Sequence, residues 1–320
     1  MTTLITGGAG FIGSRLAARY ITADQPVVIL DNFNDYYDPA VKRANVAALT
    51  ALDAAHPPVI VEGDIRDEAL LERVFGEQGI TRVAHLAAMS GVRYSIDRGP
   101  LYASVNTGGS VSLMEAARKR NVSVFVQAST SSVYGDTTPV PFVEDAAADH
   151  PLAPYPASKR AAEMFGYSYH QLFGLNVTAL RFFNVYGPHG RPDMMPIRAI
   201  ESILKGETIP MYDGGELKRD WTYIDDILDG ITAALERPLG FEIINLGYGS
   251  PIDLKEFIHI YEELIGKPAI TCDVPAPASE PAILYCDNSR ARKLLDFAPK
   301  VAIADGLART WQWYRARYGV

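Results

Sequence analysis

The sequence has 320 residues, 48% of them hydrophobic, and a formal net charge of -8 at pH 7. This composition predicts a globular protein that can bury a large core in two lobes, and its negative charge argues against nucleic acid or an anionic membrane as the main partner. No apolar run approaches the roughly 20 residues of a membrane span, and two cysteines without metal-ligand spacing favour a reducing, cytoplasmic location over a disulfide scaffold.

The first 31 residues predict a strand, a glycine-rich turn, a helix and a second strand that ends in an acid. The turn reads GGAGFIG at 7–13. At this spacing Gly7 permits a tight turn, Gly10 lets the backbone approach a pyrophosphate, and Gly13 lets the helix pack closely on the sheet. The free N–H groups at the start of that helix suit a phosphate. The stretch therefore predicts a dinucleotide site.

Asp31, at the end of the second strand, favours NAD as the dinucleotide. A carboxylate there accepts hydrogen bonds from a ribose 2′-OH and repels a 2′-phosphate. Lys42 and Arg43 follow closely and leave NADP open as an alternative. The residues expected to contact the cofactor are Gly7, Gly10, Phe11, Ile12, Gly13, Asp31, Asn32, Asn34, Lys42, Asp64, Ile65, Leu86, Ala87, Ala88, Tyr155 and Lys159.

Strands and helices continue to alternate along the next part of the chain. We expect helices near 40–53, 68–75 and 100–119, and strands near 58–62, 82–88, 122–127 and 176–181. This alternation predicts an α/β fold with a doubly wound parallel sheet of the Rossmann type, in which ligands bind beyond the carboxyl ends of the strands. The loops after Ala88 and Gln127 should therefore share one crevice with the glycine turn.

Beyond about residue 183 the pattern becomes one of short strands, short helices and proline-rich loops. We interpret this part as a smaller α/β lobe that covers the crevice. The expected division is an NAD-binding domain at 1–183 and a nucleotide-sugar-binding domain at 184–320, with some segments interleaved between them.

Tyr155 and Lys159 lie one helical turn apart at the start of a predicted helix. A phenol titrates near ~10 and is a poor base at neutral pH, so we expect the ammonium and a positive nicotinamide to lower the pKa of Tyr155. A tyrosine tuned in this way can remove a hydroxyl proton while hydride leaves the same carbon. The pair gains weight because it follows a dinucleotide-binding pattern and the hydroxyl-rich segment ASTSS at 128–132.

With these motifs the chain resembles the extended short-chain dehydrogenases/reductases. The resemblance rests on the glycine turn, Thr130, Tyr155 and Lys159, and on the strings FFNVYGP at 182–188 and RDWTYID at 219–225, so it covers nearly the whole chain. Within this family, DNFNDYYDP at 31–39, GVRYS at 91–95 and GRPDM at 190–194 are similar to strings of the UDP-glucuronate 4-epimerases.

The resemblance implies an isomerase with NAD as cofactor and a UDP-sugar as substrate. Tyr155 would take the proton of the sugar 4-OH while hydride passes from C4 to NAD, and the 4-keto sugar would turn over before hydride returns to its other face. Lys159 would hold the ribose hydroxyls and tune Tyr155. Thr130 would hydrogen-bond the 4-oxygen. Together these make Tyr155, Lys159 and Thr130 the expected catalytic residues.

Ser131 and Ser132 stand where similar dehydratases and decarboxylases carry acids. A 4-ketone beside the C5 carboxylate of a uronic acid readily loses carbon dioxide, and an acid at these positions would help to protonate or deprotonate C5. We hypothesise that the neutral hydroxyls of Thr130, Ser131 and Ser132, with Asn184, hold the carboxylate by hydrogen bonds.

Other residues are expected to bind the rest of the nucleotide sugar. Arg219 is the expected diphosphate ligand, because a guanidinium matches phosphate bidentately. The remaining expected contacts are Arg93 and Arg191 near the sugar or phosphates, Met211 and Tyr212 at the uracil, and Glu280 at the ribose. The chain departs from the resemblance at two positions. Glucuronate epimerases commonly have Thr in place of Asn184, which weakens the substrate assignment. An arginine of the UDP-galactose epimerases falls on about Pro277, which shifts more of the phosphate binding onto Arg219.

The sequence thus favours interconversion of UDP-glucuronate and UDP-galacturonate. A 4-epimerase of UDP-glucose or UDP-N-acetylhexosamine is the nearest alternative, followed by a UDP-glucuronate decarboxylase or nucleotide-sugar dehydratase, and then by a non-catalytic NAD-binding module. No metal site is expected. By analogy with related enzymes we expect a homodimer built on the helices near 100–119 and 155–173.

Overall fold

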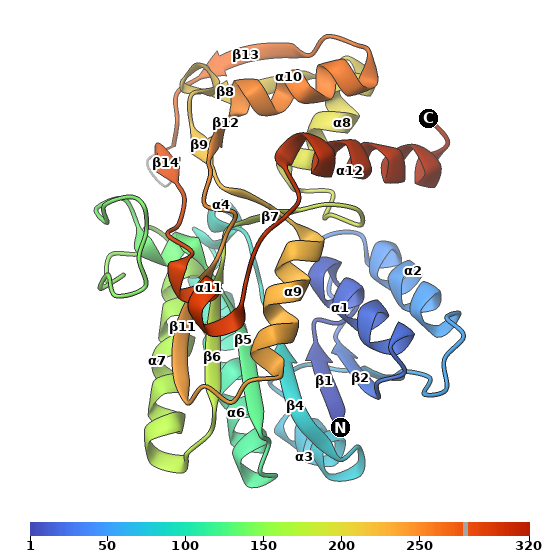
Figure 1. The fold of residues 1–320 in the computed structure, drawn as a ribbon, viewed down its shortest axis with the longest axis vertical. Coiled ribbons are helices and arrows are strands. Elements are labelled where there is room, and N and C mark those ends of the chain that lie inside the picture. Colours follow the sequence, from blue (N-terminus) through green and yellow to red (C-terminus); the bar gives the residue numbers. More distant parts are fainter. Residues whose placement is uncertain (278–280) are drawn as a thin grey trace.

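The computed structural model describes residues 1–277 and 281–320. Its centre is a seven-stranded sheet in the order β11-β6-β5-β4-β1-β2-β3, in which all neighbouring strands are parallel. Figure 1 shows this sheet in the larger, lower lobe. The strands are β1 (Thr2–Thr6), β2 (Val27–Asp31), β3 (Val59–Glu62), β4 (Ile80–His85), β5 (Val124–Thr130), β6 (Val177–Phe182) and β11 (Phe241–Leu246). The doubly wound α/β fold predicted from the sequence is confirmed.

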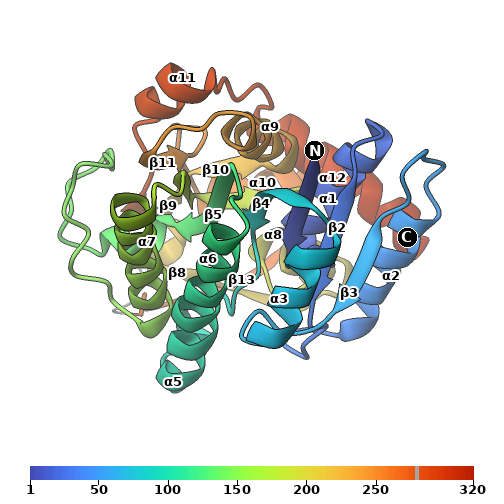
Figure 2. The same ribbon diagram turned by 90° about the horizontal axis from the view of Figure 1, so that it is seen from below.

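Helices cover both faces of the sheet (Figure 2). One layer contains α1 (Phe11–Thr22), α2 (Pro39–Thr50) and α9 (Ile224–Leu235), and the other contains α3 (Glu68–Glu77), α6 (Gly109–Lys119) and α7 (Pro154–Phe173). Two helices begin at side-chain caps, where Asp38 accepts a hydrogen bond from Ala40 N and Asp67 accepts one from Leu70 N. Gly174, with φ +69°, ends α7.

The helix expected near 100–119 is interrupted near its start. It consists of α5 (Gly99–Tyr102), a π-helical segment at Ala103–Gly108 and α6. Asn106, within the π-helical segment, exchanges hydrogen bonds with the backbone of Met89, so this segment fixes the loop that follows β4. A second short helix, α4 (Val92–Ser95), lies in that same loop.

The smaller lobe sits at the carboxyl ends of the strands, at the top of Figure 1. The helices are α8 (Met195–Lys205), α10 (Leu254–Ile265) and α12 (Ile303–Tyr318), and the short strands are β8 (Thr208–Tyr212), β9 (Lys218–Arg219), β12 (Ile252–Asp253), β13 (Ile270–Val274) and β14 (Ile283–Leu284). The pair β7 (Asn184–Tyr186) and β10 (Trp221–Tyr223) joins the lobes, and α11 (Ser289–Leu295) returns to the larger one.

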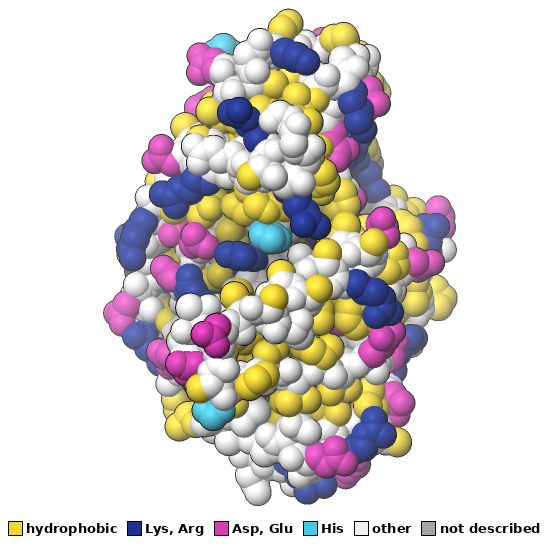
Figure 3. Space-filling view, turned by 90° about the vertical axis from the view of Figure 1, so that its right-hand side faces the viewer, with side chains coloured by type: hydrophobic (Ala, Val, Ile, Leu, Met, Phe, Trp, Pro, Cys, Tyr) yellow, Lys and Arg dark blue, Asp and Glu magenta, His cyan; other side chains and the backbone are white. Residues whose placement is uncertain are grey.

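Besides α11, two elements beyond residue 183 belong to the larger lobe. Strand β11 pairs with β6 along its whole length, and α9 packs against β4, β5 and β6. Figure 3 shows Lys/Arg and Asp/Glu side chains interspersed over the face near α1, α2 and α12, without a large field of one sign. In the described part of the chain no helix is both long and apolar enough to cross a membrane.

Candidate active site

The glycine turn between β1 and α1 leaves space where side chains would otherwise stand. Gly7 has φ +67°, a conformation that favours glycine. A Cβ on Gly13 would lie 2.2 Å from the carbonyl oxygen of Gly7, so α1 can approach the turn this closely only with glycine there. Gly10 N donates to that same oxygen at 3.0 Å. The backbone at the start of α1 is therefore exposed to the cavity beside it and can receive a pyrophosphate.

This cavity has a volume of about 260 Å³ and lies at the carboxyl ends of the strands. Every residue that the sequence suggested for the cofactor lines it: Gly7, Gly10, Phe11, Ile12, Gly13, Asp31, Asn32, Asn34, Lys42, Asp64, Ile65, Leu86, Ala87, Ala88, Tyr155 and Lys159. The glycine turn, the end of β2 and the start of α7 therefore meet around one space.

Asp31, at the end of β2, is hydrogen-bonded to the glycine turn. Its carboxylate accepts hydrogen bonds from Ala9 N at 3.1 Å and Phe33 N at 2.9 Å, and burial raises its pKa. The two nearby cations, Lys42 and Arg43, form contacts with other residues. Lys42 donates to the backbone and side-chain oxygens of Asn34 at 2.9 and 2.8 Å, and Arg43 pairs with Glu62 on the surface. This arrangement favours a ribose hydroxyl over a 2′-phosphate beside Asp31.

Thr130, Tyr155 and Lys159 line the same cavity. Thr130 ends β5, while Tyr155 and Lys159 stand on successive turns of α7. The Thr130 hydroxyl donates to Ser132 Oγ at 3.2 Å, and the Tyr155 backbone N–H donates to Ser95 Oγ at 3.1 Å. The hydroxyl groups of Thr130 and Tyr155 and the amine of Lys159 thus face one space. Proton transfer at a bound hydroxyl requires such an arrangement.

The pKa of Tyr155 is raised in the structure, whereas the sequence predicts that it is lowered. Burial raises it, and the opposing effects come from a hydrogen bond with Thr130 and from the Arg191 guanidinium rather than from Lys159. Burial also lowers the pKa of Lys159 to about 8, which Glu163 opposes. The difference arises because burial removes hydration from both groups, and this loss opposes the charged form of each.

Arg191 reaches the cavity from the loop before α8. Its guanidinium donates to Ser90 Oγ at 2.7 Å and pairs with Asp193 at 2.9 Å, and it lies over the Tyr36 ring at 5.5 Å. Of the residues expected to contact the substrate, Arg191 and Thr130 line the cavity. Arg191 thus brings a positive charge from the segment after β7 to the space that Tyr155 and Lys159 line.

The other expected substrate residues that the structure describes lie outside the cavity lining. Ser131 and Ser132 follow Thr130 directly, and Ser132 N donates to Thr130 Oγ1 at 3.2 Å. The Arg93 guanidinium lies 4.9 Å from the centroid of the Tyr212 ring. The remaining residues are Asn184 on β7, Met211 on β8 and Arg219 on β9, and Glu280 falls outside the described residues.

Several cavity residues were not expected from the sequence. They are Leu30, Tyr36, Tyr37, Gly63, Ser90, Val105, Ala128, Ser129, Phe182, Phe183, Val185 and Met194. Tyr36 and Tyr37 belong to the string DNFNDYYDP at 31–39, and two aromatic residues soon after Asp31 are the signal that could have suggested a wall of the site. The apolar residues could not be found from the sequence, because they resemble core positions. No described group of three or more His, Cys, Asp or Glu residues could hold a metal.

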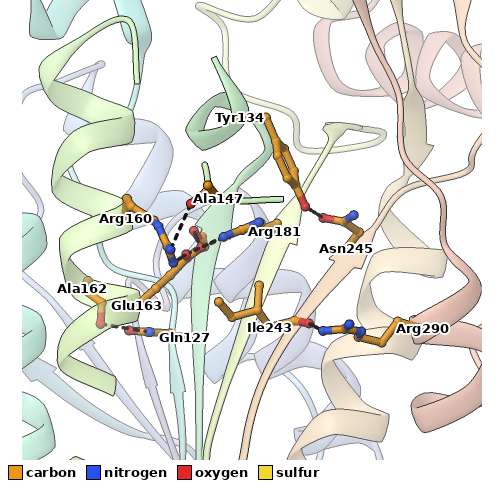
Figure 4. A network of polar contacts seen from close by, with 11 residues as sticks. Gln127, Tyr134, Ala147, Arg160, Ala162, Glu163, Arg181, Ile243, Asn245 and Arg290 are labelled. Carbon is orange, nitrogen blue, oxygen red and sulfur yellow. Dashed lines mark hydrogen bonds and ion pairs between the residues drawn. The ribbon is translucent and has the colours of Figure 1, made fainter. Parts of the chain in front are cut away.

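A buried polar network connects α7, β6 and β11 (Figure 4). Glu163 of α7 binds both Arg181 of β6 and Arg160, and Arg181 lies over the ring of Tyr134. The Tyr134 hydroxyl donates to Asn245 of β11 at 2.7 Å. The position of Glu163, four residues after Lys159, is the signal in the sequence that could have indicated this network.

Comparison with known proteins agrees with this geometry. The profile of the NAD dependent epimerase/dehydratase family matches residues 3–247. A UDP-glucuronate 4-epimerase of Thermodesulfobacterium geofontis is 40% identical over 311 residues, which cover 97% of this chain and 95% of that protein. The crystal structure of the Bacillus cereus UDP-glucuronic acid 4-epimerase with UDP-glucuronic acid and NAD has a TM-score of 0.92 at 33% identity, covering 99% of this chain and 100% of the other. The Thermotoga maritima UDP-glucose 4-epimerase, with UDP-glucose, has a TM-score of 0.90 at 29% identity and covers 99% of each chain.

Proposed function

The chain belongs to the NAD dependent epimerase/dehydratase family, and we propose that it interconverts UDP-glucuronate and UDP-galacturonate. The observation that carries this proposal is the meeting of Thr130, Tyr155 and Lys159 with the glycine turn around one cavity. The proteins named UDP-glucuronate 4-epimerase, similar over nearly the whole chain, support the choice of sugar.

In the proposed reaction Tyr155 accepts the proton of the sugar 4-OH and later returns it. Bound NAD supplies the chemistry of taking up and giving back the hydride at C4. Thr130 hydrogen-bonds the 4-oxygen, and Lys159 holds the ribose hydroxyls and favours the phenolate. The 4-keto sugar turns over between the two transfers, so the proton and the hydride both return and no atom is gained or lost.

We assign Thr130, Ser131, Ser132 and Asn184 to the C5 carboxylate. Ser131 and Ser132 place neutral hydroxyls, rather than acids, next to the end of β5, which supports retention of the carboxylate over its loss as carbon dioxide. Arg191 is assigned to the sugar or the phosphates, because it lines the cavity. Arg93 is likewise assigned to the sugar or the phosphates, since it contacts Tyr212 of the lobe over the site. Arg219 is assigned to the diphosphate, and Met211 and Tyr212 are assigned to the uracil, since they belong to that lobe.

A neutral-sugar 4-epimerase is the second candidate. At the position of Asn184 the chain is more like the UDP-galactose epimerases than like the glucuronate epimerases. The UDP-glucose 4-epimerase of Thermotoga maritima also has the same fold. In that case UDP-glucose would be converted and UDP-glucuronate would not.

The experiment incubates the purified protein with UDP-glucuronate and NAD, and in parallel with UDP-glucose, and follows both by proton NMR. We expect UDP-galacturonate from the first mixture. A UDP-pentose with carbon dioxide would instead identify a decarboxylase. Conversion of UDP-glucose alone would identify the neutral-sugar enzyme, and no product in either mixture would contradict both epimerase candidates.

We also infer that the enzyme is a cytoplasmic homodimer. The free thiols of Cys272 and Cys286 support a reducing compartment. The exposed apolar side chains of Met164, Phe165, Leu172 and Phe173 support a partner on the outer face of α7, the helix at the left of Figure 2.

A further inference from the structure

A single face of α7 carries three functional groups in a row. Tyr155, Lys159 and Glu163 follow one another at intervals of four residues, which places them on successive turns of one helical face. Tyr155 and Lys159 reach the cavity, whereas the Glu163 side chain is 1% exposed and points to β5 and β6. Glu163 therefore stands behind Lys159 as seen from the cavity.

The Glu163 carboxylate is held from three directions. Arg181 of β6 donates to it twice, at 2.9 and 2.8 Å, and Arg160 donates at 2.9 Å. Ser129, the neighbour of Thr130 on β5, donates at 2.5 Å. Figure 4 shows Glu163 between the two arginines. Such a set of donors fixes both the position and the charge of a buried carboxylate.

Glu163 is ionised despite its burial. Burial alone would raise the pKa of its carboxyl, but Arg181, Ser129 and Arg160 hold this pKa below its ordinary value. A permanent negative charge therefore lies one turn from the Lys159 amine.

We propose that Glu163 is a positioning residue whose fixed negative charge keeps Lys159 protonated at the pH at which the enzyme works. This inference rests on the proposed function and deepens it, because the proposed reaction uses the charged amine of Lys159 to hold the ribose hydroxyls. The two arginines serve Lys159 only indirectly, by holding the carboxylate in place.

The other charged groups around Lys159 fit this assignment. His85 of β4 lies near the amine, but burial lowers the pKa of the imidazole to about 3, so it is neutral at physiological pH. Arg181 of β6 and Arg160 of α7 are paired with Glu163 itself. Tyr155 is protonated in the protein alone, since burial raises its pKa, and Arg191 acts on Tyr155 from the loop before α8.

The test compares the wild type with Glu163→Gln and with the double variant Glu163→Gln/Arg181→Met. The double variant removes the ion pair as a whole and avoids an unpaired buried arginine, which can prevent folding of the single variant. The first readout is the rate of acetylation of Lys159 by trace acetic anhydride as a function of pH, in protein freed of nucleotide. Only the free amine reacts, so the midpoint reports the protonation of Lys159. The second readout is the alkaline limb of the turnover profile.

We expect both midpoints to move down by about one pH unit in both variants, because an opposite charge at short range is lost. Glu163→Asp, which keeps the charge, should remain closer to the wild type than Glu163→Gln. Unchanged midpoints in the folded variants would overturn the proposal. Acetylation needs neither sugar nor cofactor, so a wild type that converts no sugar contradicts the proposed function and leaves this test intact.

Glu144→Gln is the matched control. Glu144 is also a buried carboxylate, with a side chain 6% exposed, and it accepts from Asn245 N near Arg290. It does not line the cavity. Its loss should leave the Lys159 midpoint unchanged, and an equal shift in this control would also overturn the proposal, because the shift would then reflect general loosening of the core.

Discussion

Tyr155 and Arg191 interact electrostatically because the fold brings them to the same cavity. The two residues are 36 positions apart, yet the guanidinium acts on the phenol across the cavity and opposes the effect of burial on its pKa. Asp193 and Ser90 hold that guanidinium in place. Arg191 therefore influences the proposed base as well as the charge of the space into which a uronic acid would enter.

Ser132→Glu tests the role of the neutral hydroxyls at the end of β5. A carboxylate there would stand beside the proposed position of the sugar C5, repel the substrate carboxylate and offer a group for proton transfer. We expect epimerisation to fall at least about 10-fold, with carbon dioxide and a UDP-pentose appearing among the products. Product NMR and carbon dioxide release measure the two effects.

Ser132→Gln is the control for that substitution, because it adds the same bulk without the charge. It should lower the rate without producing carbon dioxide. Clean epimerisation by Ser132→Glu at the wild-type rate would show that Ser132 does not protect the carboxylate.

At the scale of elements, the contact between α1 and the glycine turn sets the shape of the proposed cofactor site. Gly13→Ala would place a Cβ 2.2 Å from the Gly7 carbonyl oxygen, and backbone on both sides leaves little room for relief. We expect a loss of about 1–3 kcal/mol in the free energy of unfolding, as for other overpacked positions, and a weaker affinity for NAD. Denaturant titration and calorimetric titration with NAD measure these effects.

Gly108→Ala is the companion variant for this experiment. A Cβ at Gly108 would meet its nearest atom at 3.9 Å, and the residue has helical φ and ψ. Stability should stay level or rise slightly, and NAD affinity should not change. Equal NAD affinity in Gly13→Ala and the wild type would contradict the assignment of the turn to the cofactor.

His85 links three elements and predicts a pH dependence of stability. Its ring contacts Thr6 of β1 and Ser110 of α6, both at 2.8 Å, and burial lowers its pKa to about 3. The unfolded chain binds this proton near pH ~6.5, so the folded state loses stability as the pH falls below that value. In His85→Gln the dependence of the unfolding free energy on pH, measured between about pH 4 and about pH 6, should be shallower by about 1.4 kcal/mol per pH unit. Identical slopes would indicate that His85 is charged in the folded protein.

The sequence predicted the elements whose signals are local. The glycine turn, Asp31, and the Tyr155/Lys159 spacing each depend on a few neighbouring residues, and the structure brings all of them to one cavity. The place of β11 at the edge of the sheet depends on pairing with β6, which is distant in sequence. The pKa of Tyr155 and the contacts of Glu163 depend on burial and on partners from other strands. Such properties arise only when the elements pack.

At the scale of the whole molecule, the exposed apolar side chains of α7 support a dimer contact that a charged substitution should disrupt. Leu172 is 73% exposed and lies near the end of that helix. Leu172→Glu would bring a charge into the proposed dimer contact, and burying an unpaired charge is costly. We expect the mass measured by light scattering to fall to that of a monomer.

Leu52→Glu serves as the comparison, because Leu52 is 39% exposed and follows α2 on the opposite layer of the sheet. It should leave the mass unchanged. A wild type that is already monomeric would contradict the proposed homodimer.

The place of β11 also has a consequence for synthesis on the ribosome. Until residue 246 has emerged, the nascent chain holds a sheet whose β6 edge is open. Open parallel edges invite pairing with other chains. Completion of the sheet therefore waits until β11 has emerged, and the open edge of β6 can pair with other chains during that interval.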